Sequence, residues 1–138
     1  IMYLVKKGVP VLGHIGLLPQ TSNNFKVKGK SLHQRKKILE DAFAISNSGA
    51  FGLIIECVVE SLARKITKTI SIPTIGIGAS KFCDGQILVT EDMVGLSGFS
   101  PKFVKQYANL NKSLENSVKN YAKDVKMKRF PFTKNVYK

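Results

Sequence analysis

Long apolar runs are missing from this sequence of 138 residues. No segment approaches the roughly 20 apolar residues of a membrane-spanning helix, and the first residues lack the charged, apolar and small-residue order of a signal peptide. We therefore expect a protein without a membrane span, located in the cytoplasm. The length is that of one folded domain, so we predict a single domain over residues 1–138, with a basic helix and tail over residues 111–138.

Cysteine is scarce, since only Cys57 and Cys83 are present. Neither residue has the CxxC or Cys/His spacing of a zinc site. Both fall at or just after the predicted end of a strand. We interpret them as reduced thiols.

Acidic residues are also few: 9 Asp and Glu stand against 22 Lys and Arg, which gives a net charge of +13 at pH 7. Such a charge is common in proteins that bind nucleic acid. Arginine, which base readout and bidentate phosphate binding favour, occurs only at Arg35, Arg64 and Arg129. The sequence also has no RNP-like aromatic motif. Specific nucleic-acid binding is therefore disfavoured, while non-specific attraction to phosphate stays open.

The segment FGLIIE, residues 51–56, is the clearest structural signal. An apolar run with β-branched residues predicts a strand buried on both faces, as in a parallel sheet covered by helices. Glu56 would then lie at the carboxyl end of the strand, where α/β proteins place catalytic side chains. A carboxylate that is partly removed from water there suits a general base. The alternative is a solvated Glu that only caps the start of a helix.

Strands and helices alternate along the rest of the chain. We predict strands at 9–13, 51–56, 74–78 and 86–90, and helices ending at Gly8 and spanning 31–47, 60–70, 101–110 and 110–127. In the 31–47 helix Ser31 is the expected N-cap, and the expected apolar stripe comprises Leu32, Ile38, Leu39, Ala42, Phe43 and Ile45. This alternation predicts right-handed βαβ units and a parallel sheet.

Four such units would make half of an eight-stranded barrel. An open half would expose two edge strands and its interior side chains, so it would need a partner half. A flavodoxin-like open sheet is the alternative. That fold would be expected to have a glycine-rich phosphate turn after the first strand, and HIGLLPQ (14–20) is not such a turn.

Polar or small residues follow each predicted strand. His14 follows the first strand, Glu56 ends the second, GIGAS (76–80) follows the third, and Glu91 and Asp92 follow the fourth. Each signal is weak alone, because a lone His is more often structural and a GIG turn more often a packing turn. Together they favour an enzyme whose active site lies at the carboxyl ends of the strands.

The chain resembles the ketopantoate hydroxymethyltransferase family, also called 3-methyl-2-oxobutanoate hydroxymethyltransferase. The segments that match, in the family's order, are GVPVLGHIGLLPQ (8–20), KVKGK (26–30), GAFGLIIECV (49–58), IPTIGIGAS (72–80), CDGQILV (83–89) and PKFVKQY (101–107). The resemblance implies a (β/α)8 TIM-type barrel in which this chain supplies strands five to eight, followed by C-terminal helices. It also implies transfer of a hydroxymethyl group from 5,10-methylenetetrahydrofolate to 3-methyl-2-oxobutanoate, giving 2-dehydropantoate in pantothenate biosynthesis.

The same resemblance assigns roles to two residues. It implies that Glu56 is the proton acceptor and that His14 is a hydrogen-bond donor to the substrate. The family's Mg²⁺ is held by acidic residues on the first four strands. No such motif occurs here, and Glu91 and Asp92 do not match those positions, so we expect no metal ligand in this chain.

The expected partners are therefore a complementary N-terminal half-barrel and, for the intact enzyme, further copies in a homo-oligomer. We expect a truncated or split hydroxymethyltransferase that is inactive alone. A non-catalytic remnant that keeps only the fold or assembly surfaces is the alternative, and a basic nucleic-acid-binding domain is less favoured.

Overall fold

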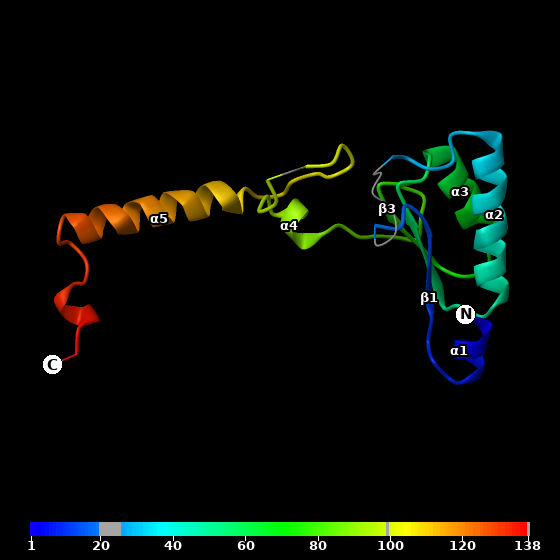
Figure 1. The fold of residues 1–138 in the computed structure, drawn as a ribbon, viewed down its shortest axis with the longest axis horizontal. Helices are drawn as coiled ribbons and strands as arrows, with labels where there is room; N and C mark the ends of the chain where they lie inside the picture. Colours follow the sequence, from blue (N-terminus) through cyan, green and yellow to red (C-terminus); the bar gives the residue numbers. More distant parts are fainter. Residues whose placement is uncertain (20–25, 99, 138) are drawn as a thin grey trace. The chain divides into compact units, whose positions relative to one another are not determined.

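The computed structural model describes residues 1–19, 26–98 and 100–137 (Figure 1). The chain divides into two compact units, Ile1–Ile87 and Leu88–Lys138. Within the described ranges, no helix combines the length and apolar composition needed to cross a membrane. The prediction of a single domain stays a prediction.

The first unit contains a parallel sheet whose strands pair in chain order. Its strands are β1 (Leu12–Gly16), β2 (Gly52–Glu56), β3 (Thr74–Ile77) and β4 (Gly85–Gln86). Helix α2 (Leu32–Asn47) connects β1 to β2, and α3 (Glu60–Thr69) connects β2 to β3. The predicted α/β class with a parallel sheet is confirmed. Among the described strands the order does not reverse, whereas doubly wound folds such as flavodoxin contain a reversal.

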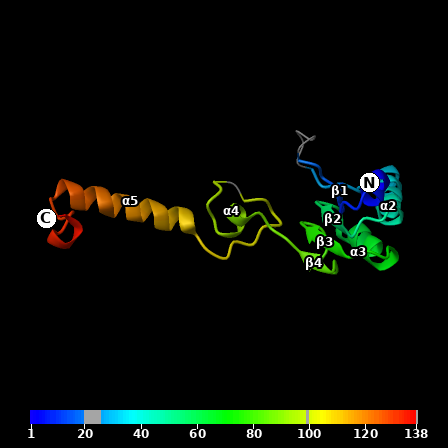
Figure 2. The ribbon, with the colours of Figure 1, turned by 90° about the horizontal axis from the view of Figure 1, so that it is seen from below.

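Helices α2 and α3 lie on the same side of the sheet (Figure 2). Leu53 and Ile55 of β2 are fully buried in the core, together with Ile38, Ala42, Leu62 and Ile66 of the two helices.

Successive strand residues point to opposite faces, so Leu12, His14, Ile54 and Glu56 belong to the other face. Leu12 is exposed there and Ile54 is only half-buried. One face of the sheet therefore carries the core, and the other is more open than the predicted strand buried on both faces.

Helix α2 begins as the sequence predicts. The Ser31 hydroxyl accepts a hydrogen bond from the Gln34 backbone N–H at 3.2 Å, and Gly49, with φ +85°, follows the helix. The predicted apolar stripe is correct for Ile38 and Ala42, which are buried. It is wrong for Leu32, which is 85% exposed, and for Phe43, which is 38% exposed, because these residues lie off the side that faces the sheet.

Strand β1 lies three residues later than predicted, so His14 is inside the strand instead of following it. Two features keep residues 9 and 10 out of the sheet. The Val9 N–H donates to the Leu4 carbonyl of helix α1 (Met2–Lys6), and Pro10 has no N–H to donate. Pairing then runs from Leu12 beside Gly52 to Gly16 beside Glu56.

Strand β4 is shorter than predicted and ends at Gln86. One more bond follows, from the Ile87 N–H to the Gly76 carbonyl at 3.0 Å. The pairing ends there because the partner strand, β3, itself ends at Ile77. Thr90 then begins the short helix α4 (Thr90–Met93). Glu91 and Asp92 therefore lie in a helix of the second unit and do not follow a strand, so their prediction as strand-end residues is wrong.

The second unit contains α4, α5 (Leu110–Lys126) and the 3-10 helix η1 (Thr133–Asn135). The predicted amphipathic helix from Leu110 is confirmed. The helix predicted over 101–110 is absent. The N–H groups of Tyr107 and Leu110 donate to the carbonyls of Met93 and Val94, so these amides bond to the segment around α4 and not to a preceding turn.

Candidate active site

The structure brings the two predicted site residues together on the open face of the sheet. Glu56 is the last residue of β2, and His14 lies two residues before the end of β1. The His14 Nε2 lies 3.1 Å from the Glu56 Oε2, and the side chains are 28% and 13% exposed. A carboxylate and an imidazole thus share one partly desolvated position near the carboxyl edge of the sheet.

The contact between these side chains is close but is not an aligned hydrogen bond. The Nε2 atom is buried and has no hydrogen-bond partner among the described residues, although it lies within ion-pair distance of the carboxylate. A buried polar atom without an aligned partner costs free energy unless another group satisfies it. The Nε2 atom therefore lacks a hydrogen-bond partner that the described residues could supply in aligned geometry.

Gly16 brings the end of β1 against Glu56, a feature that the sequence analysis missed. Its φ is +96°, and a Cβ there would lie 2.1 Å from the Glu56 carbonyl oxygen and 2.6 Å from Val58 Cγ2. The next residue, Leu17, donates its N–H to that carbonyl at 2.9 Å. Only glycine fits this conformation and this space. The glycine that follows His14 by two residues in GHIG was the available signal.

Cys57 fixes the backbone on the other side of Glu56. Its φ of +50° is in the left-handed region, which is unfavourable for a residue with a Cβ. Its N–H donates to the Ile77 carbonyl at 2.9 Å, and its carbonyl accepts from the Lys28 N–H at 2.8 Å. Burial, reinforced by the charge of Glu56, raises the pKa of the Cys57 thiol. The thiol stays protonated, so the residue acts through its backbone.

The CDGQ segment, part of the family resemblance, holds the start of β3. The Asp84 carboxylate accepts hydrogen bonds from the Thr74 N–H at 2.8 Å and the Thr74 hydroxyl at 2.9 Å. Thr74 is fully buried, and its hydroxyl also contacts the Thr67 hydroxyl at 2.8 Å. Cys83 is buried beside this group, and both cysteines are free. The role of Asp84 is therefore structural.

The Asp84 contacts predict a pH dependence of stability. Hydrogen bonds from the Thr74 backbone and side chain lower the pKa of Asp84 below its usual value. A lowered pKa in the folded state contributes stability above the ordinary value of about 4, and this stability is lost as the pH falls through the folded pKa. We expect Asp84→Asn to lower the free energy of unfolding by about 1 kcal/mol at pH 7. The variant should also show a flatter decline below about pH 4. Urea unfolding from pH 3 to 7 checks this, and parallel pH curves would contradict it.

The end of the GIGAS segment, whose Gly76 and Ile77 belong to β3, packs against the start of α3. The Ser80 hydroxyl donates to Glu60 Oε1 at 3.1 Å and accepts from the Phe82 N–H at 3.2 Å. Ser80 is buried. These contacts favour a packing turn over a ligand-binding loop.

A metal site does not fit the described residues. Across residues 1–19, 26–98 and 100–137, no group of three or more His, Cys, Asp and Glu side chains could hold a metal ion. His14 and Glu56 are a single pair. The Mg²⁺ that the resemblance implies has no ligand set in these ranges, and no chemical step is derived through it.

The fold and the paired side chains indicate the class of protein, an α/β enzyme. A parallel α/β sheet with a His–Glu pair at the carboxyl end of its strands is an arrangement typical of α/β enzymes. Comparison with known proteins then identifies the family. The family model described as ketopantoate hydroxymethyltransferase matches residues 1–133. The chain belongs to the ketopantoate hydroxymethyltransferase family.

Three relatives named 3-methyl-2-oxobutanoate hydroxymethyltransferase match nearly the whole chain. The protein of Phenylobacterium zucineum is 51% identical over 99% of this chain and 51% of its own length. That of Pelagibacter ubique is 48% identical over 97% of this chain and 52% of its own length. That of Clostridium botulinum is 49% identical over 98% of this chain and 50% of its own length. The chain therefore spans about half the length of these relatives.

Proposed function

We propose that this chain provides the proton acceptor, Glu56, for transfer of a hydroxymethyl group to 3-methyl-2-oxobutanoate. The donor is 5,10-methylenetetrahydrofolate and the product is 2-dehydropantoate. The observation that carries this proposal is the His14–Glu56 contact of 3.1 Å on the open face of the sheet, in a chain whose relatives are named for this activity.

The chemistry of the substrate fits this pair. Glu56 takes the proton from C3, the carbon next to the ketone, and the electrons of the C–H bond move to the ketone oxygen as an enolate. His14 donates a hydrogen bond to the bound keto acid, because its Nε2 lacks an aligned partner. The enolate carbon then forms a bond to the methylene carbon of the folate. Both C–N bonds of that methylene break, one water molecule supplies the hydroxyl oxygen, and the two nitrogens take up the C3 proton and one proton of the water, which releases tetrahydrofolate. General-base catalysis of this kind contributes about 10²–10⁴-fold to the rate.

We further propose that the chain is half of a (β/α)8 barrel and works with a complementary N-terminal half. Three features support this. The strands pair in chain order without reversal, α2 and α3 lie on one face of the sheet, and the opposite face presents His14, Glu56 and exposed apolar residues such as Leu12. In a barrel the opposite face would become the interior. The complementary half would also bring the ligands for Mg²⁺.

The test is product formation by a reconstituted enzyme. The partner is the part of the Phenylobacterium zucineum relative that this chain does not match, expressed separately. We expect 2-dehydropantoate from the mixture of the two chains and none from either chain alone. A folded mixture that forms a complex without making product would favour the non-catalytic alternative.

A further inference from the structure

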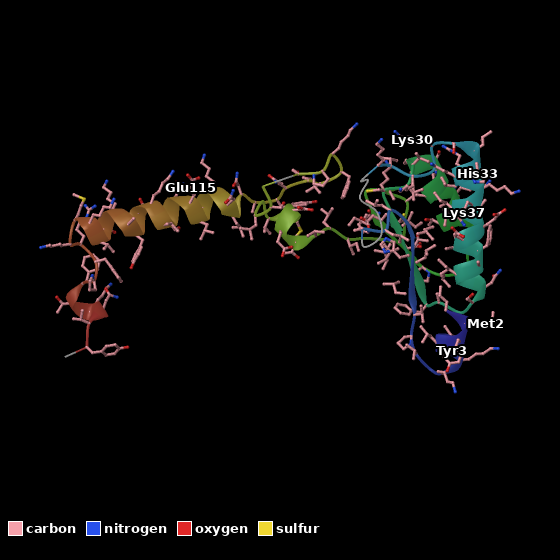
Figure 3. The ribbon with its side chains drawn as sticks, viewed as in Figure 1. Met2, Tyr3, Lys30, His33, Lys37 and Glu115 are labelled. Atoms are coloured by element: carbon pink, nitrogen blue, oxygen red, sulfur yellow. The ribbon has the colours of Figure 1, made fainter. Side chains whose placement is uncertain are left out.

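Cationic side chains gather at the carboxyl edge of the sheet, the edge at which Glu56 ends β2. Helices α2 and α3 each follow a strand, so both begin at this edge. The cations come from the KVKGK segment, the first two turns of α2 and α3, and the loop after β3. We call them the basic rim: Lys26, Lys28, Lys30, Arg35, Arg64 and Lys81. Figure 3 shows Lys30 just before the first turn of α2.

The KVKGK segment lies directly beside the residues that follow Glu56. The Lys28 N–H donates to the Cys57 carbonyl at 2.8 Å, and the Lys28 carbonyl accepts from the Val59 N–H at 3.0 Å. These two bonds make a parallel bridge to the chain after β2. One end of the basic rim is thus bonded to the residue next to the candidate base.

The rest of the basic rim surrounds the start of α3. The Arg35 Nη2 donates to the Ser61 hydroxyl at 3.2 Å. The Arg64 guanidinium carbon lies 4.2 Å from the centre of the Phe82 ring, and the Lys81 Nζ lies 5.2 Å from the same centre. Attraction of both cations to one aromatic ring offsets part of the repulsion between them.

The cations of the basic rim lack acidic partners. Over residues 26–39 and 61–83 the sequence contains no Asp or Glu. In the part of the chain that the structure describes, the ion pairs involve other cations, and Glu60 accepts instead from the Ser80 hydroxyl at 3.1 Å. Lys28 and Arg35 are half-buried and the other four side chains are exposed. A surface with several charges of one sign attracts a ligand with several charges of the other.

The proposed one-carbon donor is a ligand of this kind. Reduced folates in cells end in a chain of glutamates joined through their γ-carboxyl groups, and each added glutamate brings one more carboxylate. The p-aminobenzoyl group separates this chain from the reacting methylene. A folate whose methylene lies at Glu56 therefore places its glutamate chain outside the reacting centre. The keto acid, in contrast, carries a single carboxylate.

We infer that the basic rim binds the γ-glutamate chain of the folate donor, so that the enzyme prefers folates with several glutamates. This inference rests on the proposed function and adds the place where the charged end of the donor binds. Nucleic acid is the competing anionic ligand. A single strand would also need aromatic side chains on which its bases stack, and Phe82, the aromatic residue in contact with the rim, already holds Arg64 and Lys81.

The test compares 5-formyltetrahydrofolate that carries one glutamate with the same folate that carries five. Each is titrated by calorimetry into the complex of this chain with the complementary half. An exposed ion pair contributes at most about fivefold to affinity, so four added carboxylates should together lower the Kd by about tenfold. This gain should shrink as the salt concentration rises from about 0.05 M to about 0.5 M, because exposed charges are screened.

Two double variants remove charges from separate segments of the basic rim. One combines Arg64→Gln with Lys81→Gln, and the other combines Lys26→Gln with Lys30→Gln. All four side chains are exposed, so the exchanges should leave the fold in place. Each double variant should raise the Kd for the folate with five glutamates by about fivefold and the Kd for the folate with one glutamate by less than about twofold.

The matched control combines Lys6→Gln with Lys68→Gln. These exposed lysines lie in the last turns of α1 and α3, at the opposite edge of the sheet. The control removes the same number of charges and should change neither Kd.

The outcomes separate this inference from the proposed function. Equal Kd values for the two folates, or an equal loss in the control and in the rim variants, would overturn the inference, while product formation by the same complex would still support the proposed function. An oligonucleotide whose binding the rim variants abolish, with no gain from added glutamates, would assign the rim to phosphate and also overturn it. A complex that prefers the folate with five glutamates but makes no product would support the binding site and contradict the proposed function.

Discussion

Replacing Glu56 by Gln should reduce product formation by the reconstituted enzyme by about 10²–10⁴-fold, the usual contribution of a general base. The amide has nearly the same shape as the carboxylate, so it preserves the packing at the end of β2 but cannot accept the C3 proton. The loss should appear in kcat, since proton transfer occurs in the transition state and not in substrate binding.

The control for this prediction is Glu40→Gln. Glu40 is exposed on α2, where its Oε1 lies 3.9 Å from the Lys36 Nζ. Both variants remove one negative charge. If Glu56→Gln and Glu40→Gln had the same small effect, Glu56 would not be the proton acceptor.

Gly16→Ala should produce the second large effect, although residue 16 has no side chain to contact a substrate. A Cβ at φ +96° would meet the Glu56 carbonyl at 2.1 Å, so β1 and β2 must separate at the point where Glu56 is held. We expect a loss of stability of about 1–3 kcal/mol from the backbone conformation alone. A fall in kcat of about 10²-fold should accompany it, because a shift of about 1 Å at a catalytic group has that consequence.

The matched exchange is Gly98→Ala, where a Cβ would meet nothing within 4 Å. Stability is measured by urea unfolding of the chain and kcat by product formation with the complementary half. Gly16 acts through the position of Glu56. The fall in kcat at 25 °C should therefore be larger than the unfolded fraction of the Gly16→Ala variant, calculated from its unfolding free energy, can explain. A Gly16→Ala variant as active as Gly98→Ala would remove Gly16 from this role.

The sequence predicted the features that depend on local signals. The apolar run before Glu56 identified β2 and its end. In a chain where strands and helices alternate, an apolar segment of strand length fits few local structures other than a buried strand. Ser31 marked the start of α2 through capping chemistry. The sequence placed His14 and Glu56 near the carboxyl ends of parallel strands, although the predicted bounds of β1 were three residues early; their contact of 3.1 Å is known only from the structure.

Other features depend on contacts between distant segments and could not be predicted this way. The register of β1 is set by its pairing with β2 and by the bond from Val9 to Leu4. The left-handed conformation of Cys57 is held by carbonyl and N–H partners at Ile77 and Lys28. The hydrogen bonds from Thr74 to Asp84 join residues that are ten positions apart in the sequence. The helix predicted over 101–110 was wrong because its amides bond to the segment around α4.

The most direct test of the central claim is hydrogen–deuterium exchange at C3 of 3-methyl-2-oxobutanoate, followed by NMR in the presence of Mg²⁺. This measurement isolates proton abstraction from folate binding. If Glu56 is the proton acceptor of a split enzyme, exchange should occur when this chain is mixed with the complementary half and should be lost with Glu56→Gln. Undiminished exchange in the Glu56→Gln mixture would contradict the role of Glu56. Absence of exchange in a folded complex of the unchanged chains would show that the pair does not perform this chemistry.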